Sequence, residues 1–419
     1  MSRILLIEPA FPIPQKSRNH KNFLPIGLLK IATYLRDHKH KVKFFRGIPK
    51  DSNELIEIIK FKPEEVWITS LYTYWACYVR ESVQYYRSKI PGAYIKVGGI
   101  YASLIPAIEV KEYTGCDEVH QGVMSEVEEY IQSNPPAYDL VSNLNPHPID
   151  FQIIHASRGC TRTCSFCGTW KIESEFIPRR SIKDEIHLPG VVFYDNNFLM
   201  NPYIEDILNE LIGLRKIGKV KWVESQSGLD GRVLINKPNL ANMMIEAGFR
   251  YPRIAWDWGY DQSRYIERQI GILARAGYKS RDIFVFMLYN HEIPFEEMER
   301  KRIRCWEWQI QIADCRFRPL NQLIDEYNPQ AVGQTSKSYF ISEGWDDDLV
   351  KQFRRNVRRQ NICVRMRYPI YSSTAEHKSL GKEILIELRE LKTVEEKKAF
   401  LETSGVDYWI PEQVSFPEK

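Results

Sequence analysis

The sequence contains no uninterrupted apolar stretch of about 18 residues, the length that a transmembrane helix requires. Its first apolar run, residues 4–7, ends at Glu8 and is too short to be the core of a secretion signal. We therefore expect no membrane partner. We interpret this run as a buried strand and expect a cytoplasmic protein.

The chain also lacks a marked excess of charge of either sign. Its 58 Lys and Arg residues against 54 Asp and Glu residues give a net charge of +4. So mild an excess makes a nucleic-acid partner unlikely. Hydrophobic residues at 43% and charged residues at 27% exclude a disordered chain and are typical of a globular protein. A length of 419 residues predicts two or three domains.

Cysteine is scarce and unevenly spread. A secreted protein held by disulfides would be smaller and denser in cysteine than this chain, which has eight. Five of the eight are scattered, with no two closer than ten positions, so a second cysteine cluster is not expected. The other three, Cys160, Cys164 and Cys167, fall within eight residues. Such a group in a cytosolic protein predicts a metal site.

The first 135 residues alternate between strand and helix patterns. Apolar β-type runs occur at residues 4–7, 42–45, 66–71, 95–99 and, weakly, 118–122. Residues 25–36 and 77–89 show the three- and four-residue spacing of amphipathic helices. Five strands joined by helical crossovers predict a flavodoxin-like doubly wound parallel sheet, with ligands beyond the carboxyl ends of its strands.

A second α/β region follows a proline-rich stretch without periodicity. Its candidate strands begin near residues 153, 191, 221, 253, 283 and 308, with helices expected at 203–214, 239–247, 265–276 and 296–304. Six strand–helix units predict a partial, open (β/α)6 barrel with function at the strand ends. The remaining residues predict helices at 346–359, 384–391 and 394–401. The expected domains are residues 1–135, a linker at 136–150, the barrel at 151–325 and a mostly helical C-terminal cap or lid at 326–419.

The three grouped cysteines follow the first barrel strand with the spacing Cys-x3-Cys-x2-Cys. Three thiolates on one loop can hold three irons of a [4Fe–4S] cube and leave the fourth iron open to a ligand. The alternative is a zinc site, which needs four ligands, with His155 as the fourth. Arg158 lies close to His155 in the sequence, and its charge disfavours a metal dication there. Both alternatives remain at this point.

Cys160, Cys164, Phe166 and Cys167 resemble the signature of radical S-adenosylmethionine (SAM) enzymes, including the aromatic residue before the third cysteine. The order of domains resembles the subgroup with an N-terminal cobalamin-binding-like domain. This resemblance implies a [4Fe–4S] cluster whose open iron binds the amino and carboxylate groups of SAM. Reduction of the cluster would then cleave SAM to methionine and a 5′-deoxyadenosyl radical, which abstracts hydrogen from a substrate. It also implies a reducing partner such as flavodoxin or ferredoxin.

The resemblance implies further SAM-binding residues at the ends of the barrel strands. Asp195 and Asn196 stand where the family binds the SAM amine, as an Asp-Asn variant of the usual Gly-Gly-Glu, with a loop cap as the alternative role. Glu224, Gln226 and Asp257 end later strands and offer oxygen and amide groups to the ribose or the methionine moiety.

Cys315 is a candidate catalytic residue on the sixth strand. Gln309, Gln311 and Cys315 alternate in the sequence, which predicts that they share one strand face lining the barrel lumen. There Cys315 would donate a hydrogen atom to a product radical. A buried, inert cysteine is the alternative.

The resemblance places cobalamin at the carboxyl edge of the N-terminal sheet. The expected contacts are Ser70, Gly98, Gly99 and Gly122, because glycines let a ligand approach the backbone closely. The Asp-x-His-x-x-Gly motif that supplies a cobalt ligand elsewhere is missing after the first strand, so we expect binding without a histidine ligand. The aromatic residues 72, 74 and 75 would either pack against the corrin or fill its space.

These features predict a radical SAM enzyme that acts on a small molecule. Methyl transfer through cobalamin is the first expectation, and a cobalamin-independent rearrangement or cyclisation is the second. A non-catalytic iron–sulfur or zinc sensor is the alternative of another class. The sequence contains no motif that identifies the substrate.

Overall fold

The computed structural model describes residues 1–14, 20–21, 23–142, 149–368, 370–372 and 381–409. The chain forms two compact units. The first comprises Met1–Ser227, Glu246–Phe249 and Arg318–Tyr327, and the second comprises Gly228–Ile245, Arg250–Phe317 and Asn328–Lys419. The division falls after Ser227, within the region expected to form the barrel. The domain boundaries inferred from the sequence therefore stay a prediction.

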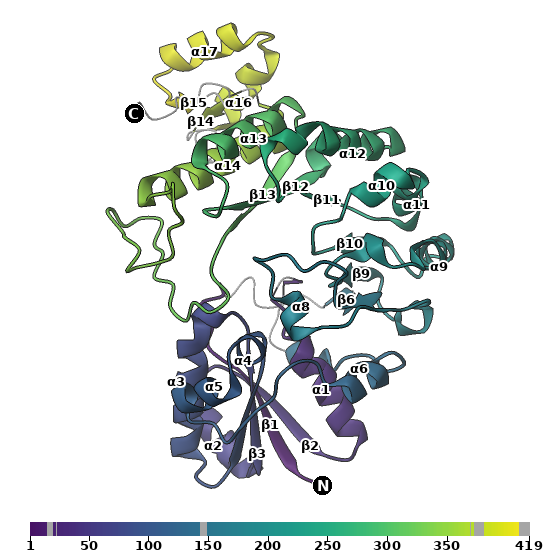
Figure 1. Cartoon of the computed structure of the whole chain (residues 1–419), viewed down its shortest axis with the longest axis vertical. Coiled ribbons are helices and arrows are strands. Elements are labelled where there is room, and N and C mark those ends of the chain that lie inside the picture. The colour runs from purple at the N-terminus through teal and green to yellow at the C-terminus, as the bar shows by residue number, and fades with distance from the viewer. Residues whose placement is uncertain (15–19, 22, 143–148, 369, 373–380, 410–419) are drawn as a thin grey trace. The chain divides into compact units, whose positions relative to one another are not determined.

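The first unit begins with a parallel five-stranded sheet of order β2-β1-β3-β4-β5, the order of flavodoxin-like doubly wound sheets. Figure 1 shows α3 and α5 on one side of the sheet and α1 and α6 on the other. The elements are β1 (Arg3–Glu8), α1 (Ile26–Asp37), β2 (Lys41–Arg46), α2 (Ser52–Phe61), β3 (Glu65–Ser70), η2 (Thr73–Trp75), α3 (Ala76–Lys89), β4 (Tyr94–Gly99), α4 (Ile100–Leu104), α5 (Ala107–Thr114), β5 (Glu118–Val119), α6 (Ser125–Ile131) and α7 (Asp139–Ser142).

Both faces of this sheet are buried, which explains why β1 is a continuous apolar run. Leu5 and Ile7 belong to the core on the α3 side, whereas Ile4 and Leu6 pack with α1 on the other side. The stretch expected as a linker partly joins this core. Ala137 donates its backbone N–H to the Leu29 carbonyl, 3.1 Å away, while residues 143–148 lie outside the described residues.

The first unit continues with a parallel three-stranded sheet of order β10-β9-β6. Its long helix α9 carries Glu205 and Asp206 in the first turn and Arg215 and Lys216 in the last, which complements the helix dipole. The elements are β6 (Phe151–Ile154), β7 (Ser157–Arg158), α8 (Thr169–Ile172), β8 (Ile177–Pro178), η3 (Lys183–Glu185), β9 (Gly190–Phe193), η4 (Phe198–Met200), α9 (Ile204–Lys216) and β10 (Trp222–Ser225).

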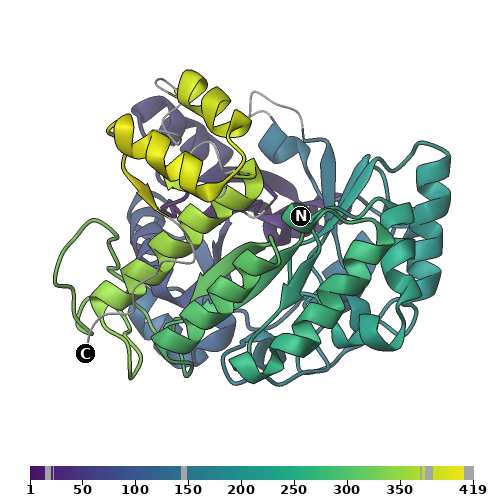
Figure 2. The same cartoon turned by 90° about the horizontal axis from the view of Figure 1, so that it is seen from above.

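The second unit contains another parallel three-stranded sheet, of order β11-β12-β13. Helices α13 and α14 contact its strand β13 (Figure 2). The elements are α10 (Arg232–Asn236), α11 (Asn239–Ala247), β11 (Arg253–Ala255), η5 (Tyr260–Gln262), α12 (Ser263–Ala276), η6 (Ser280–Asp282), β12 (Phe284–Tyr289), α13 (Phe295–Glu307), β13 (Gln311–Arg316), α14 (Asp347–Met366), β14 (Tyr371–Ser372), α16 (Gly381–Glu390), α17 (Val394–Thr403) and β15 (Tyr408–Trp409).

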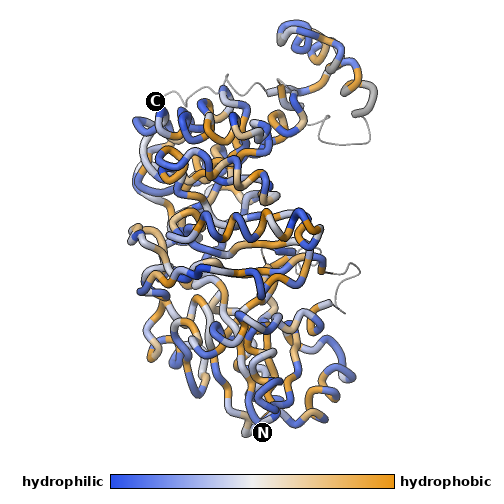
Figure 3. The backbone as a smooth tube through the Cα atoms, turned by 90° about the vertical axis from the view of Figure 1, so that its right-hand side faces the viewer, coloured by the Kyte–Doolittle hydropathy of each residue, from blue (hydrophilic) through white to orange (hydrophobic). Residues whose placement is uncertain are grey.

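The α/β fold class is confirmed, and so is the existence of six parallel strands after residue 150. These strands form two three-stranded sheets in different units, so a single six-stranded barrel stays a prediction. Apolar and polar residues alternate along the helices, as amphipathic packing requires (Figure 3). Among the described residues, no helix combines the length and apolar character needed to cross a membrane. Residues 410–419 of the expected cap lie outside the described part.

Candidate functional site

The three grouped cysteines lie on the loop between β7 and α8 of the first unit. All three are half-buried, and none forms a disulfide. The loop begins at Gly159, whose φ of +72° is in the left-handed region. A Cβ there would lie 2.0 Å from the Glu175 carbonyl oxygen, so only glycine fits this close crossing of chains. The backbone thus fixes where the cysteine loop starts.

An ion pair closes the same loop at its base. The Arg158 guanidinium lies 2.7 Å from the Glu173 carboxylate, whose other oxygen accepts the Gly159 N–H at 2.5 Å. Within the loop, the Cys164 carbonyl accepts hydrogen bonds from the Cys167 N–H, at 3.1 Å, and from the Trp170 indole, at 3.0 Å. These contacts hold the loop through groups other than the thiols.

His155 lies behind this clamp and is surrounded by positive charge. Its Nε2 is 2.7 Å from an Arg158 nitrogen, and its Nδ1 is 3.4 Å from the Lys30 ammonium. Lys30 in turn donates to both Glu128 oxygens, at 3.0 and 2.9 Å. Burial, followed by the charges of Lys30, Arg158 and Arg179, holds the pKa of His155 well below its ordinary value.

The zinc alternative therefore loses the ligand proposed for it. Both ring nitrogens of His155 face cationic side chains, which leaves neither directed at a metal dication. Within the part of the chain that the structure describes, no three His, Cys, Asp or Glu side chains, the three loop cysteines included, converge as ligands of one metal ion. Three cysteines on one loop, none of them in a disulfide and each able to hold a different iron, fit the donor set of a [4Fe–4S] cluster with one open corner.

Asn196 is the sequence-predicted residue that the structure connects to the cysteine loop. Its Oδ1 accepts a hydrogen bond of 3.0 Å from the Thr169 hydroxyl. The same hydroxyl lies 3.3 Å from Cys167 Sγ. Thr169 carried no signal in the sequence, because its partner Asn196 follows a different strand. Phe166 lies on the loop itself and is partly buried, and its expected contact with SAM stays a prediction.

Asp195 has a different environment from the one expected of an ammonium ligand. Its side chain is fully buried, and its two carboxylate oxygens accept hydrogen bonds from the Ala156 N–H, at 2.9 Å, and the Ser157 hydroxyl, at 2.6 Å. Burial raises its pKa to about 6. These contacts tie the end of β9 to the start of the cysteine segment. Pairing of Asp195 with the SAM amine stays a prediction.

Glu224 and Gln226 occupy the end of β10. Glu224 is buried and forms an ion pair with Lys21, a partner that the sequence gave no reason to expect. The Gln226 amide nitrogen is buried and has no hydrogen-bond partner among the described residues. The neighbouring Asn197 is also buried, and its Oδ1 has no hydrogen-bond partner among the described residues. Such polar atoms indicate a place that a polar ligand can complete.

Asp257 and Cys315 belong to the second unit. Asp257 follows β11, and burial raises its pKa, although the charge of Lys301 opposes the shift. The buried Lys301 ammonium donates to the carbonyls of Trp256 and Trp258, at 2.8 and 2.9 Å, and so holds the loop that carries Asp257. The role of Asp257 in binding SAM stays a prediction.

The expected arrangement of the sixth strand is partly wrong. Strand β13 starts at Gln311, whereas Gln309 is exposed and has a φ of +52°, so it lies outside the strand. The Gln309 N–H bonds instead to the Trp306 carbonyl at the end of α13. Cys315 is exposed, which contradicts the alternative of a buried, inert cysteine. Its hydrogen-donor role stays a prediction.

The expected cobalamin contacts lie at the carboxyl edge of the five-stranded sheet. Ser70 is buried, and its hydroxyl bonds to the Gly98 carbonyl at 2.7 Å and to the Ala102 N–H at 3.1 Å. A Cβ on Gly99 would lie 2.2 Å from the Ser70 carbonyl oxygen, so the protein's own backbone explains this glycine. Gly122 has a φ of +78°, and a Cβ there would lie 3.7 Å from the Ile172 carbonyl of α8, the helix that follows the cysteine loop.

Aromatic side chains gather beside this edge. Tyr72 and Tyr74 stack with their centroids 5.0 Å apart, and Trp75 stacks on Phe11 at 5.2 Å. The Arg318 guanidinium lies over the Tyr74 ring at 4.4 Å. Tyr72 remains 36% exposed. The choice between packing against a corrin and filling its space stays open to experiment.

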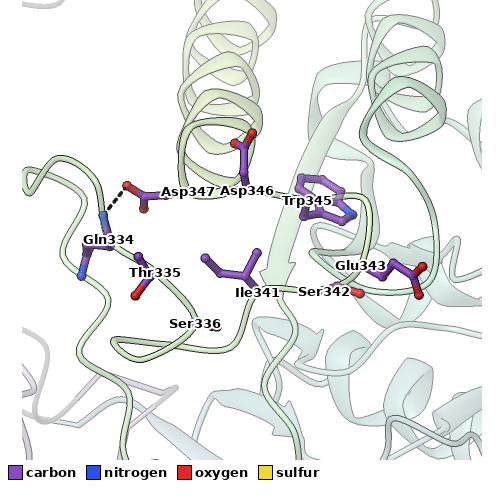
Figure 4. Close-up of a pocket in the computed structure, with 9 residues that line it drawn as sticks. All are labelled: Gln334, Thr335, Ser336, Ile341, Ser342, Glu343, Trp345, Asp346 and Asp347. Atoms are coloured by element: carbon purple, nitrogen blue, oxygen red, sulfur yellow. Dashed lines mark hydrogen bonds between the residues drawn. The ribbon is translucent and has the colours of Figure 1, made fainter.

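A separate cavity of about 400 Å³ lies in the second unit at the start of α14 (Figure 4). Its lining residue Asp347 is held by Lys351 at 2.6 Å, the Tyr339 hydroxyl at 2.9 Å and the Gln334 N–H at 3.0 Å. None of the residues singled out from the sequence lines this cavity. We therefore do not assign the chemistry of the cysteine loop to it.

The chain thus combines a five-stranded parallel sheet of flavodoxin-like order with six further parallel strands. The three-cysteine loop follows the first of these six strands. Two solved structures of the cobalamin-dependent S-adenosylmethionine radical enzyme OxsB share this fold. The structure with aqua-cobalamin and S-adenosylmethionine bound has a TM-score of 0.51 and 10% identity, and the match covers 74% of this chain and 52% of that chain. The structure with aqua-cobalamin bound has a TM-score of 0.50 and 12% identity, with the same coverage.

This chain therefore shares the fold of OxsB over about three quarters of its length. It spans about half the length of OxsB. No protein-family model and no curated protein matches its sequence.

Proposed function

We propose that this protein is a radical SAM enzyme that holds a [4Fe–4S] cluster on Cys160, Cys164 and Cys167. The observation that carries the proposal is the position of the three-cysteine loop directly after β6 and β7, in a chain that shares its fold with OxsB. The motif alone allows other metals, and the fold alone allows other chemistry. Their coincidence in one chain favours this function.

The chain's own groups would hold and orient the cluster. Each thiolate binds one iron, and the Arg158–Glu173 clamp keeps the loop ends together while the thiols are engaged. When bound, the reduced cluster supplies the electron that cleaves SAM to methionine and a 5′-deoxyadenosyl radical. A reducing partner such as flavodoxin or ferredoxin would supply that electron.

The SAM site would lie beside the loop and involve the ends of β9 and β10. Asn196 is connected to the loop through Thr169, and the Gln226 amide nitrogen and the Asn197 side-chain Oδ1 are polar atoms that a ligand can satisfy. Phe166 and Glu224 complete the part of the proposed set that lies in the first unit. A contact of Asp257 with SAM stays an expectation from the sequence. Asp195 would act mainly by holding the Ala156–Ser157 backbone, because both of its oxygens are already engaged.

We further propose that cobalamin binds at the carboxyl edge of the five-stranded sheet. OxsB binds aqua-cobalamin, and in this chain α8, which follows the cysteine loop, comes within contact of Gly122 at the same edge. Methyl transfer to a small molecule is the reaction that such a pair of cofactors favours. A cobalamin-independent rearrangement or cyclisation is the second candidate, supported by the stacked tyrosines that occupy part of the edge. Reconstitution with hydroxocobalamin decides between them: corrin absorbance that fails to co-elute with the protein on gel filtration removes the methyltransferase proposal.

The cluster is tested by anaerobic reconstitution followed by iron and sulfide analysis. We expect about four irons and four sulfides per chain, because the three cysteines would hold one [4Fe–4S] cluster. The triple variant Cys160→Ala, Cys164→Ala and Cys167→Ala should lose this content, whereas Cys315→Ala, an exposed cysteine outside the loop, should retain it. Zinc as the bound metal, or four irons retained by the triple variant, would overturn the proposal.

A further inference from the structure

The three-stranded sheet of the second unit has one fully buried face. Helices α12, α13 and α14 contact its strands (Figure 1), and Phe353 of α14 lies against Tyr289 with ring centroids 5.0 Å apart. Side chains alternate between the two faces of a sheet. On this face at most 2% of each side chain is exposed: Ile254, Val285, Met287, Tyr289 and Ile312. The protein's own helices therefore complete this face.

The opposite face of the same sheet is only half-buried. The strand register pairs Phe286 with Ala255 on one side and with Ala313 on the other, so these three apolar side chains form a row. Leu288 and Cys315 form the next row toward the carboxyl ends of the strands. A parallel sheet normally has both of its faces covered. This apolar face therefore has area left for a further apolar group.

Asp257 ends the half-buried face at the carboxyl end of β11. It lies two positions after Ala255, and the Trp256 N–H donates to the Phe286 carbonyl at 3.0 Å, so strand pairing continues to this point. Side chains two positions apart along a strand share a face. Asp257 is half-buried and accepts no hydrogen bond from the residues that the structure describes. A carboxyl group thus borders the apolar row with its hydrogen-bonding capacity unused there.

Two cationic side chains beside this turn are engaged by other groups. The Lys301 ammonium donates to two backbone carbonyls of the turn, at 2.8 and 2.9 Å, and acts on Asp257 through its charge. The Arg232 guanidinium lies over the Trp258 ring at 4.7 Å and donates two hydrogen bonds of 2.8 Å to Asp230. A carboxylate that is withdrawn from water without a hydrogen bond is costly. A positively charged donor is therefore the partner that best completes Asp257.

We propose that this face binds the substrate, a small molecule with an apolar body and an ammonium group. The inference rests on the proposed function, because it takes the molecule bound here to be the one on which the enzyme acts. The apolar body lies along the row of Ala255, Phe286 and Ala313. The ammonium group pairs with the Asp257 carboxylate at the strand ends, where open α/β sheets bind their ligands.

SAM is the competing ligand for this carboxylate. It also carries an ammonium group, and the sequence led us to expect a contact between Asp257 and SAM. The two assignments differ in what saturating SAM does to the face. If Asp257 serves the substrate, an amine still binds when the SAM site is full, and loss of the carboxylate leaves SAM affinity unchanged. If Asp257 serves SAM, both results reverse.

The test uses the anaerobically reconstituted full chain with saturating SAM and two small probes. Phenethylamine has an apolar body and an ammonium group, and phenethyl alcohol is its uncharged analogue of the same length. Titrations followed by saturation-transfer nuclear magnetic resonance should give a roughly tenfold to hundredfold lower dissociation constant for the amine, as expected for a charge-assisted hydrogen bond. Asp257→Asn, which keeps the shape of the side chain, should lose this preference and bind the alcohol as the wild type does.

Two further variants and the SAM affinity complete the test. Asp261→Asn, which changes an exposed carboxylate nearby in the chain, is the matched control and should keep the preference for the amine. Phe286→Leu, which reduces the apolar row, should weaken both probes to the same extent. An absent preference in the wild type, a preference retained by Asp257→Asn, or a loss of SAM affinity in Asp257→Asn would overturn this inference. If the chain assembles no cluster, the proposed function fails, and the same comparison of probes without SAM still tests the binding face.

Discussion

Arg158 and Glu173 meet at 2.7 Å across the base of the cysteine loop, one residue before Gly159 and six residues after Cys167. Because Glu173 also accepts the Gly159 N–H, the pair fixes both the entry and the exit of the loop. The side chains are 22% and 15% exposed, so solvent screens this ion pair less than a surface pair. The loop is thus shaped by contacts that do not need the metal.

This clamp gives the first prediction. Glu173→Ala removes the ion pair and the Gly159 hydrogen bond, so the loop should hold its cluster less firmly and release iron to a chelator several-fold faster than the wild type. Glu175→Ala, two residues away and exposed, is the control and should release iron at the wild-type rate. Equal release rates for Glu173→Ala and the wild type would show that the clamp does not stabilise the loaded loop.

Lys30 and Glu128 give the second prediction. Their ion pair is largely buried, with side-chain exposures of 4% and 24%, and it faces His155. Lys30→Met leaves Glu128 without its partner and should reduce the free energy of unfolding by about 3 kcal/mol. Adding Glu128→Gln should recover part of the lost free energy of unfolding, because the double variant leaves no buried carboxylate without its partner. Urea denaturation of both single variants and the double variant measures this coupling, and strictly additive effects would contradict it.

Asp195 gives a prediction with a defined pH dependence. Burial raises its pKa from 3.8 to about 6, so the folded protein binds a proton that the unfolded chain releases at lower pH. This group therefore contributes stability that is present at low pH and is lost as the pH rises from 3.8 to about 6. Asp195→Asn does not ionise, so its stability relative to the wild type should increase across that window and stay level above it.

Chemical denaturation between pH 4.5 and 8 checks this dependence. Asp184→Asn, which changes an exposed carboxylate, should show a level difference from the wild type. Asp195→Ala should be destabilised at every pH by about 2–4 kcal/mol, since it leaves the Ala156 N–H and the Ser157 hydroxyl buried without their partner. A flat difference for Asp195→Asn would refute the raised pKa.

Gly99 gives a prediction that separates structure from cofactor binding. Its φ is +96°, and an added Cβ would lie 2.2 Å from the Ser70 carbonyl oxygen, so Gly99→Ala should destabilise the protein by at least about 2 kcal/mol. At Gly98 the nearest atom to an added Cβ is 3.7 Å away, so Gly98→Ala should fold as the wild type does. Thermal unfolding of the cobalamin-free protein compares them. Equal thermal unfolding midpoints for Gly99→Ala and the wild type would show that the backbone does not require glycine at this position. Cobalamin binding would then be the better explanation of Gly99.

Local sequence patterns predicted the elements well where each element depends on its own residues. Helix α11 was expected at residues 239–247 and is found at Asn239–Ala247, because its apolar spacing alone defines it. The fifth strand ends at Val119 rather than near residue 122. The sixth strand begins late because Gln309 adopts a positive φ just after α13.

The candidate site likewise has features that local sequence predicts and contacts that only tertiary packing creates. The three grouped cysteines lie within eight residues, so a metal site on them could be predicted from the sequence alone. The contact between Lys30 and His155 joins residues 125 positions apart, and the bond from Thr169 to Asn196 spans 27 positions. No sequence period encodes such pairs, because tertiary packing alone brings them together. The sequence for that reason pointed to the cysteines proposed as cluster ligands but missed the residues that hold the loop.

The most direct test of the central claim is the release of 5′-deoxyadenosine from SAM. The anaerobically reconstituted chain, reduced with dithionite and supplied with SAM, should form 5′-deoxyadenosine and methionine in equal amounts, even slowly and without substrate. Cys160→Ala, Cys164→Ala and Cys167→Ala should each abolish it, because each removes one of the three iron-binding thiolates. Product quantified by liquid chromatography and mass spectrometry would establish the proposed chemistry. A fully loaded, reduced cluster that forms no 5′-deoxyadenosine would contradict it and favour a non-catalytic iron–sulfur sensor.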